Sequence, residues 1–311
     1  MPILSIIIPT YNREKILHKT LLAANKAIED LDAEIIVVND SKINTPVFSE
    51  KFVKTILVNN PLQGPASARN FGEKLASAPN LLFMDDDFII NASCLKEVLK
   101  SLGTFPNDCF NFPNQYPPEL YNKIKKTQFG RYLIAKGVTA TKDTWSAHWK
   151  ETELFENPGG LGSGFLAIKK QLFKQTGGYD QSCIFAGEDE DLLNKLKQFN
   201  ARVFINPFCT VYHNEEDKTE IKSWLYRQYI GKKTSLQWQV SIGNNIDWPY
   251  SPFKSFILPL LEELENLLLG ILKMIPNTKY FDLLYFRIVD TLYIINLYRG
   301  FRDILKPHLH E

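Results

Sequence analysis

The sequence predicts an α/β fold in which a mostly parallel sheet is flanked by helices and followed by a helical C-terminal extension. Within its first 38 residues the chain shows a strand, a helix and a second strand. The same alternation continues to about residue 102, and longer helical periods follow residue 216. Because parallel strands need a crossover connection, the alternation predicts parallel pairing with right-handed crossovers.

The first strand–helix–strand unit is defined by its apolar pattern. Residues 3–9 form a continuous apolar, β-branched run, which is typical of a strand covered on both faces. We expect Asn12 to cap the helix that follows. The apolar residues of that helix recur every three or four positions: Leu17, Leu21, Ala24, Ile28 and Leu31. Residues 34–38 form the second buried strand.

The pattern then continues as strand, helix, strand and helix. These segments are expected at residues 55–58, 65–77, 80–84 and 93–102. In open sheets of this kind, ligands bind outside the carboxyl ends of the strands. Polar clusters follow three of the strands, at residues 10–12, 39–41 and 85–87. We expect these clusters to converge on one crevice.

The second half of the sheet region is less regular. Residues 103–158 mix prolines, aromatics and polar residues, and we expect them to carry specificity for the ligand. A glycine-rich turn at 159–164 precedes a strand at 165–168 and a helix that ends at Gly177. A further helix starts near Glu188, and a strand follows at 201–205. The inner face of that helix is expected to hold Leu192, Leu193, Leu196 and Phe199.

The last part of the chain carries two apolar stripes separated by Pro276. The first comprises Ile257, Leu260, Leu261, Leu264, Leu268, Ile271, Leu272 and Ile275, and the second Phe281, Leu284, Ile288, Leu292 and Ile295. Such helices either contact a membrane surface peripherally, pack on each other or on the rest of the chain, or form a homodimer. We expect a catalytic domain at residues 1–215, divided near residue 102 into two halves. Residues 216–311 form the helical region.

Composition excludes several classes of function. The net charge of +1 lacks the basic excess of a nucleic-acid-binding protein. None of the four cysteines lies in a Cys-x-x-Cys pair, which argues against zinc or redox motifs and favours a reducing compartment. The N-terminus has no signal-peptide pattern, and no apolar run reaches the roughly 18 residues of a membrane span. We therefore expect a cytoplasmic protein, alternatively one held peripherally at the inner face of the membrane.

Two acidic clusters carry the chemistry. Three consecutive aspartates, residues 85–87, repel one another unless they are neutralised. A solvated turn accounts for a lone pair of acids, but at a ligand-binding sheet edge the cluster favours a metal that bridges phosphate oxygens. Four acids begin the helix at residue 188, more than the helix dipole requires, so we expect one to act as a general base. His213 is either structural or a nitrogen ligand that would favour Mn²⁺ over Ca²⁺.

The order of these motifs resembles a known family. The stretches SIIIPTYNR, IIVVNDS, GPASARNFG and LLFMDDD resemble the nucleotide-binding half of the GT-A glycosyltransferases, in particular the inverting family 2. The stretch GLGSGFLAIKKQLFKQTGGYDQSCIFAGEDEDLLNKL is similar to the C-terminal segment of β-1,4-galactosyltransferases. The resemblance covers about residues 3–215, and it implies a nucleotide-binding half at residues 1–102 and an acceptor half at residues 103–215.

The resemblance implies a role for each matching residue. Thr10 and Tyr11 would flank the nucleobase, which Asn39 and Asp40 would also contact. Arg69 would lie against the nucleotide. Asp85 and Asp86 would hold the ribose, while the metal ligands would be drawn from Asp85, Asp87 and His213. Asp189 would be the catalytic base, with Glu188 beside it to hold the acceptor.

One departure concerns the nucleobase. Family members usually carry two aspartates where this chain has Asn39 and Asp40. The amide of Asn39 still accepts a hydrogen bond but brings no charge. UDP is still the expected donor nucleotide, because the resemblance implies it. Since Asn39 departs from the family pattern, guanine and thymine nucleotides stay open as alternatives.

The sequence thus indicates an inverting, metal-dependent glycosyltransferase of polysaccharide biosynthesis. It would use Mn²⁺ or Mg²⁺ to move a sugar from a nucleotide-diphosphate sugar to a hydroxyl of a glycan or lipid-linked saccharide. One alternative is a catalytically silent nucleotide-sugar-binding subunit, against which the acids at 85, 87 and 189 argue. Another is a nucleotidyltransferase, which usually needs a glycine- and lysine-rich phosphate loop that the N-terminus lacks.

Overall fold

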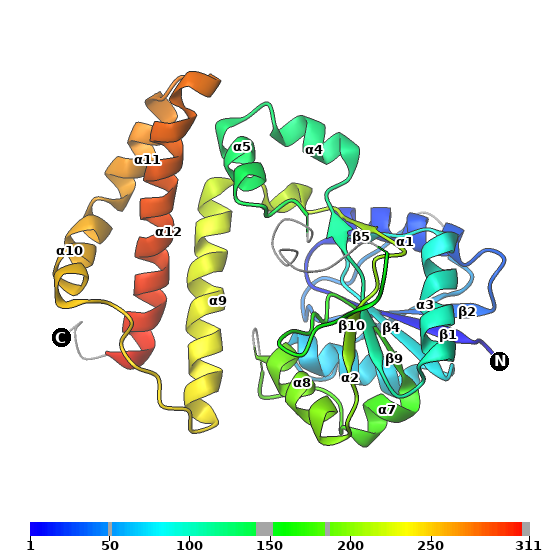
Figure 1. The fold of residues 1–311 in the computed structure, drawn as a ribbon. Coiled ribbons are helices and arrows are strands. Elements are labelled where there is room, and N and C mark those ends of the chain that lie inside the picture. The colour runs from blue at the N-terminus through cyan, green and yellow to red at the C-terminus, as the bar shows by residue number, and fades with distance from the viewer. Residues whose placement is uncertain (49–51, 141–151, 184–186, 307–311) are drawn as a thin grey trace. The chain divides into compact units, whose positions relative to one another are not determined.

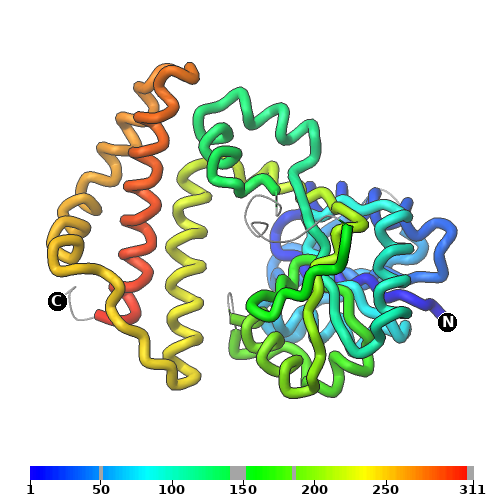
Figure 2. The backbone as a smooth tube through the Cα atoms, viewed as in Figure 1, coloured from blue at the N-terminus to red at the C-terminus, as the bar shows by residue number. Residues whose placement is uncertain are grey.

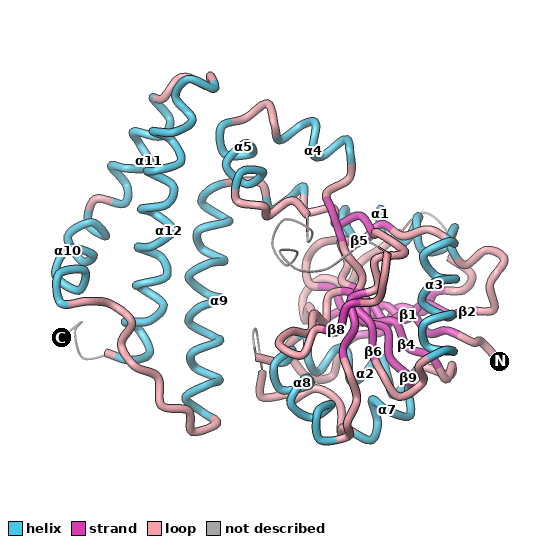
Figure 3. Tube along the Cα trace, in the orientation of Figure 1, coloured by secondary structure: helices cyan, strands magenta, loops and turns pink. Residues whose placement is uncertain are grey.

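The chain forms two compact units. The structure is a computed structural model that describes residues 1–48, 52–140, 152–183 and 187–306. The first unit comprises Met1–Pro117 and Ala140–Asn214, and the second comprises Pro118–Thr139 and Glu215–Glu311. All described strands belong to the first unit, and the second is helical (Figures 1 and 3). Residues 118–139, which we placed in the acceptor half, therefore group with the C-terminal helices, while the division into functional domains stays a prediction.

The first unit is built on an eight-stranded sheet with the order β3-β2-β1-β4-β9-β6-β10-β8. Its strands are β1 Leu4–Thr10, β2 Ala33–Asn39, β3 Thr55–Asn59, β4 Asn80–Met84, β6 Cys109–Asn111, β8 Phe155–Glu156, β9 Phe165–Lys169 and β10 Val203–Ile205. The pairs among β1 to β4 are parallel, as is β6 with β10. Strand β9 runs antiparallel to β4 and β6, and β8 antiparallel to β10. The predicted mostly parallel α/β sheet is confirmed.

Helices cover both faces of this sheet. Helices α1 (Glu14–Ala27) and α3 (Ala92–Thr104) contribute to the apolar core on one face. Helices α2 (Pro65–Leu75), α7 (Lys170–Gln175) and α8 (Glu188–Gln198) contribute to the core on the other. Because successive strand residues point to opposite faces, neighbours within β1 belong to different cores. This explains why the central strands read as continuous apolar runs.

Two local predictions were wrong. The N-cap of α1 is Arg13, and Asn12 instead adopts a left-handed conformation with φ 54° in the turn before it. Asparagine tolerates this region better than most residues, so it suits a tight turn. Phe199 lies beyond the end of α8 and is exposed, because the chain turns at Asn200, where φ is 55°.

A second, three-stranded sheet with the order β5-β11-β7 lies in the same unit. Its strands are β5 Phe88–Ile89, β7 Asn114–Gln115 and β11 Val211–His213. Strand β11 pairs antiparallel with β5, which sets His213 opposite Phe88. Strands of two or three residues are too short to show a period, so the sequence did not predict this sheet. It brings the segment after the aspartate cluster next to His213.

The second unit is a helical assembly. Its elements are α4 Pro118–Ile124, α5 Gln128–Ala135, η1 Glu216–Lys218, α9 Ile221–Ser241, α10 Pro252–Glu263, α11 Glu265–Met274, η2 Lys279–Phe281 and α12 Asp282–Leu305. Helix α12 packs along α9, and α10, α11 and α5 also contact it (Figure 2). The core of the unit includes Tyr285, Val289 and Leu292 of α12. Among the described residues, no helix combines the length and the apolar character needed to cross a membrane.

The first C-terminal stripe was only partly predicted. The run divides at Leu264 into α10 and α11, and its members Leu260, Leu264 and Ile271 are exposed. The buried side of the two helices includes Leu272, a member of the predicted stripe, and Leu258, which is not one. Since the sequence is apolar on more than one side of these helices, periodicity alone did not identify the packed side.

Candidate active site

A cavity of about 450 Å³ lies where β1, β2 and β4 end. The parallel register sets Thr10 opposite Asn39, so the carboxyl ends of these strands meet at one edge. Seven of the predicted site residues line the cavity: Thr10, Tyr11, Asp40, Arg69, Asp85, Asp86 and Glu188. The structure thus brings the predicted nucleotide-binding residues together, with the exception of Asn39.

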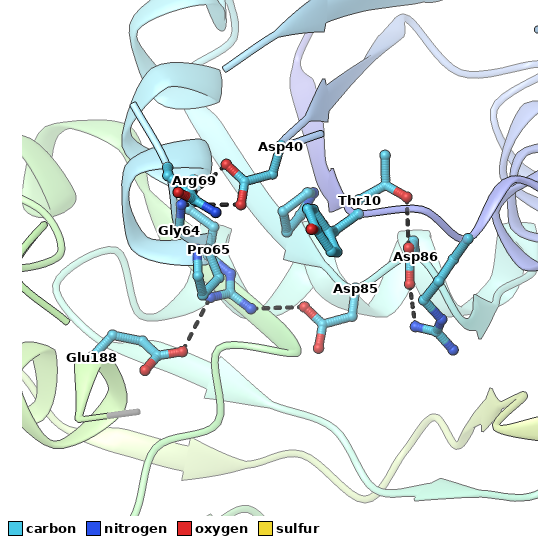
Figure 4. A pocket seen from close by; sticks show the side chains of 12 residues that line it. Thr10, Asp40, Gly64, Pro65, Arg69, Asp85, Asp86 and Glu188 are labelled. Atoms are coloured by element: carbon cyan, nitrogen blue, oxygen red, sulfur yellow. Dashed lines mark hydrogen bonds and ion pairs between the residues drawn. The ribbon is translucent and has the colours of Figure 1, made fainter. Parts of the chain in front are cut away.

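Arg69 lies between two carboxylates of the cavity (Figure 4). Its guanidinium donates to Asp85 Oδ1 over 2.7 Å and to Glu188 Oε1 over 3.4 Å, and its side chain is 5% exposed. Burial alone would lower the pKa of Arg69, but Asp85 and its other neighbours raise that pKa above its ordinary value. Arg69 is therefore a fixed cation that joins the acid at the end of β4 to the first acid of α8.

Asp86 is buried beneath Thr10 and Arg13. Thr10 Oγ1 donates to Asp86 Oδ2 over 2.6 Å, and Arg13 Nη1 lies 2.5 Å from Asp86 Oδ1. The other guanidinium nitrogen of Arg13, Nη2, lies 2.9 Å from Asp87 Oδ2. Burial raises the pKa of Asp86 to about 7, although Arg13 opposes this shift. We did not predict a role for Arg13. Its signal was its place in PTYNR, directly after a strand that ends at the ligand edge.

Asp87 and His213 form the candidate metal centre. Asp87 is fully buried, and its Oδ1 lies 3.1 Å from Nε2 of His213. The imidazole stacks on Phe88 with ring centroids 4.5 Å apart, which holds its orientation. Together with Glu215, two residues further along the chain, these residues form a candidate ligand group of one imidazole and two carboxylates. This donor set fits Mn²⁺ and related divalent ions. Asp85, which we also predicted as a ligand, is not a member of the group.

Asp189 lies in the first turn of α8, which begins after Gly187 at φ 101°. Its Oδ1 accepts a hydrogen bond from Ser163 N over 3.0 Å and a second, short one from Ser163 Oγ. Burial and the neighbouring Glu188 raise the pKa of Asp189 to about 6. The carboxylate is therefore mostly ionised at neutral pH and able to accept a proton. Sequence analysis missed Ser163, because only the fold brings the glycine-rich turn to α8.

The two acids at the start of α8 face different spaces. Glu188 lines the 450 Å³ cavity, whereas Asp189 lines a second cavity of about 310 Å³ with Gly159, Gly160 and Asn194. The remaining acids of the cluster behave differently. Glu190 is exposed, and Asp191 pairs with Lys195 over 2.6 Å and accepts from the Asp180 N–H.

Asp40 and Asn39 organise the loops at the cavity. The Asp40 carboxylate accepts from Gly64 N at 3.0 Å and from Asn60 Nδ2 at 2.6 Å, which fixes the turn before α2. The Asn39 amide donates to the Ser41 and Asn44 carbonyls and to Asn59. Asn39 is buried and does not line the cavity, so its effect on a ligand would act through the loop that it holds.

Comparison with known proteins identifies the family of this chain. The sequence model of the family described as Glycosyl transferase family 2 matches residues 5–162, just over half of the chain. The chain belongs to this family. The aspartate cluster at the end of β4 lies inside the matched region.

Several proteins have sequences related to this chain. An uncharacterized glycosyltransferase of Haemophilus influenzae is 30% identical over 199 residues, which cover 63% of this chain and 62% of the relative. Validoxylamine A glucosyltransferase of Streptomyces hygroscopicus subsp. limoneus is 30% identical over 140 residues, which cover 40% and 31%. The GalNAc(5)-diNAcBac-PP-undecaprenol beta-1,3-glucosyltransferase of Campylobacter jejuni is 32% identical over 108 residues, which cover 32% and 34%. The chain thus spans less than two thirds of the length of each relative.

Two solved structures share the fold of this chain. A mannosyltransferase from Pyrobaculum calidifontis, in complex with GDP-Man and Mn²⁺, has a TM-score of 0.51 at 15% identity, covering 96% of this chain and 87% of its own. GalNAc-T7, with UDP, GalNAc and Mn²⁺, has a TM-score of 0.51 at 15% identity, covering 69% and 43%. The predicted GT-A fold is confirmed. The likeness of the acceptor half to β-1,4-galactosyltransferases stays a prediction, and residues 184–186 of that stretch lie outside the described residues.

Proposed function

We propose that this glycosyltransferase moves a sugar from a nucleotide-diphosphate sugar to an acceptor hydroxyl, with inversion at the anomeric carbon. The observation that carries the proposal is the placement of two consecutive acids. Glu188 borders the cavity that holds the predicted nucleotide-binding residues, and Asp189 borders the smaller cavity beside it. A base at this junction can reach an acceptor in one cavity while the donor occupies the other.

The larger cavity suits the donor. Thr10 and Tyr11 line it at the end of β1, where the proposed nucleobase would lie, and Asp40 lines it at the end of β2. Arg69 supplies a buried cation for a phosphate or ribose, and binding of the donor would compete with its present contact to Asp85. We propose UDP as the nucleotide, because Asp40 can accept a hydrogen bond from the uracil N–H.

Asp87, His213 and Glu215 are the residues that would hold Mn²⁺ or Mg²⁺. A metal bound there would supply positive charge to the leaving diphosphate. The proposal is supported by the donor set itself. Arg13 already places a cation against Asp87 and Asp86. The negative charge of these two carboxylates is therefore offset by positive charge at this place in the site. Two structural neighbours, GalNAc-T7 and the Pyrobaculum mannosyltransferase, were solved with Mn²⁺.

The proposed chemistry is a single displacement. Asp189 accepts the proton of the acceptor hydroxyl, whose oxygen forms a bond to the anomeric carbon. The bond from that carbon to the diphosphate breaks, and its electron pair leaves with the nucleoside diphosphate. Because Ser163 occupies Oδ1 of Asp189, Oδ2 is the oxygen that would take the proton.

We propose a glycan or a lipid-linked saccharide as the acceptor. The name of the Campylobacter relative describes transfer to an undecaprenol-linked saccharide, which supports the second class. A lipid-linked acceptor would be presented at a membrane, so we propose a cytoplasmic protein with peripheral contact to the inner face. We propose that this sugar transfer serves polysaccharide biosynthesis.

The test is a panel of UDP-, GDP- and dTDP-sugars, each incubated with the protein in Mn²⁺ and in EDTA. We expect one nucleotide class to raise the melting temperature and to release nucleoside diphosphate when an acceptor extract is added. The anomeric configuration of the product, read by NMR, should be opposite to that of the donor. Retained configuration would overturn the inverting mechanism, and stabilisation by GDP-sugars alone would overturn the choice of UDP.

A further inference from the structure

An apolar surface runs along one side of α10 and α11. It is formed by seven large residues that are between 36% and 82% exposed: Phe253, Phe256, Leu260, Leu264, Leu267, Ile271 and Met274. Consecutive members are three or four positions apart. On a helix of 3.6 residues per turn they lie within an arc of roughly 80°. We call this surface the α10–α11 stripe.

The stripe is continuous across the joint between the two helices. Only Leu264 separates α10 from α11. Its N–H donates to the Leu261 carbonyl over 3.1 Å, and its carbonyl accepts from Leu268 N over 2.9 Å. Helical hydrogen bonding therefore passes through the joint. At about 1.5 Å per residue, the stripe is roughly 33 Å long.

The opposite side of α10 and α11 is already used by the second unit. Leu258 and Leu272 are buried there. Glu262 is bound by Arg299 over 2.9 Å and by Arg302 over 2.5 Å, and Glu265 is bound by Arg299 over 2.6 Å. The stripe is therefore additional to the core of this unit. An exposed apolar surface of this extent on a folded protein usually marks a contact site.

The charges around the stripe favour an anionic partner. Between residues 252 and 281 the exposed charged side chains are Lys254, Lys273 and Lys279 and a single acid, Glu263. The other two acids of this segment are the ones held by Arg299 and Arg302. Lys254 and Lys273 lie near the two ends of the stripe but roughly 80° and 100° around the helix from its edges, and Lys279 follows the end of α11. Long cationic side chains at such positions can reach lipid phosphates while phenylalanine and leucine enter the acyl boundary.

The same spacing is unfavourable for pairing with a second copy. A coiled-coil seam repeats strictly every seven residues. In the register fixed by Phe253, Phe256 and Leu260, the later seam positions include Glu263 and Gly270. A seam would therefore bury a carboxylate at one position and leave no side chain at another, whereas a flat lipid surface tolerates an acid at the edge of the stripe.

We infer that the α10–α11 stripe binds the surface of an anionic phospholipid bilayer, with its apolar side chains at the boundary between headgroups and acyl chains. The inference does not depend on the sugar-transfer chemistry. A chain bound in this way would stay beside an acceptor anchored in the same bilayer.

The test is co-sedimentation of the full chain with phosphatidylcholine vesicles that contain phosphatidylglycerol, compared with phosphatidylcholine alone. We expect binding to the anionic vesicles that weakens as salt is raised. Exchanging Leu260 and Leu267 together for glutamine should lower the partition coefficient about tenfold or more, because both side chains lose apolar burial. Both residues are exposed, so the melting temperature should not change. Val53→Gln, which alters an even more exposed apolar residue of the first unit, is the control and should bind as the wild type does.

Charge variants test whether the surface that the stripe binds is anionic. Lys273→Glu with Lys279→Glu should weaken binding to the anionic vesicles, and Glu263→Gln should strengthen it. Absence of wild-type binding at low salt would overturn the inference. So would unchanged binding of the Leu260 and Leu267 double variant. A dimer seen by light scattering and lost in that variant, without any vesicle binding, would assign the stripe to a second copy instead.

Discussion

Ser163 donates two hydrogen bonds to the same oxygen of Asp189, one from its backbone N–H and one from its hydroxyl. Ser163 is almost fully buried, and it comes from the turn before β9, far from α8 in the sequence. The arrangement fixes the rotamer of Asp189 and leaves its second oxygen for the acceptor. It also stabilises the ionised carboxylate against burial and the neighbouring Glu188, which raise its pKa.

Ser163→Ala should therefore move the acidic limb of the pH–rate profile upward. A base works in its ionised form, so activity is lost as pH falls through its pKa. In the wild type we expect this loss near pH 6, where the pKa of Asp189 lies. Loss of the hydroxyl donor raises that pKa further, so kcat relative to wild type should be lower at pH 6 than at pH 8. A uniform fall at all pH values would reduce Ser163 to a packing role. Ser182→Ala, at an exposed serine, is the control.

Asp189→Asn separates binding from chemistry. Asparagine keeps the shape and accepts the Ser163 hydrogen bonds, but it cannot take the proton. We expect kcat to fall by about 10²- to 10⁴-fold while donor affinity, measured by calorimetry, changes little. Glu190→Gln and Asp191→Asn should keep most activity, since Glu190 is exposed and Asp191 binds Lys195. A dead Asp191 variant beside an active Asp189 variant would show that the base is assigned wrongly.

Asp87→Ala should abolish transfer and Mn²⁺ binding, and EDTA should abolish transfer reversibly. The buried carboxylate of Asp87 is the centre of the candidate ligand group, and Arg13 keeps Asp86 as a partner when Asp87 is removed. His213→Ala should weaken Mn²⁺ binding less, because the carboxylates remain. Titration of Mn²⁺ by isothermal calorimetry compares the three proteins. Full activity in EDTA would contradict metal dependence, and an unchanged Mn²⁺ affinity in the His213 variant would leave that residue with a structural role.

Gly164→Ala should weaken donor binding without unfolding the protein. A Cβ at Gly164 would lie 2.9 Å from Oδ2 of Asp85 and 3.5 Å from its Cγ. The Asp85 side chain is partly exposed and can move, so it should turn away from Arg69 and disturb the donor cavity. We expect KM for the donor to rise several-fold with little change in melting temperature. Gly103→Ala, where a Cβ meets nothing within 4 Å, is the matched control. A large loss of stability would show that the backbone, and not Asp85, takes up the strain.

The sequence by itself determined the parallel strands at the centre of the large sheet and grouped most residues of the candidate site. Continuous apolar runs fixed β1, β2 and β4, because strands buried on both faces need apolar residues at every position. The polar residues after these strands meet at one edge in any parallel sheet, so Thr10, Asp40 and Asp85 could be grouped before the fold was known. The order of several short motifs then indicated the family, and the match to the sequence model of that family confirms it.

Only the tertiary structure decided which atoms of these residues meet. Ser163 and Asp189 are 26 positions apart, and Asp87 and His213 are further apart still, so no local period relates them. The pairing of Arg13 with two acids could not be predicted from the sequence. An ion pair depends on the distance between side chains, and sequence spacing does not fix that distance across a turn. The packed side of α10 and α11 was undetermined for a related reason. These helices are apolar on two sides, and only contact with α12 decides which side is buried and which forms the stripe.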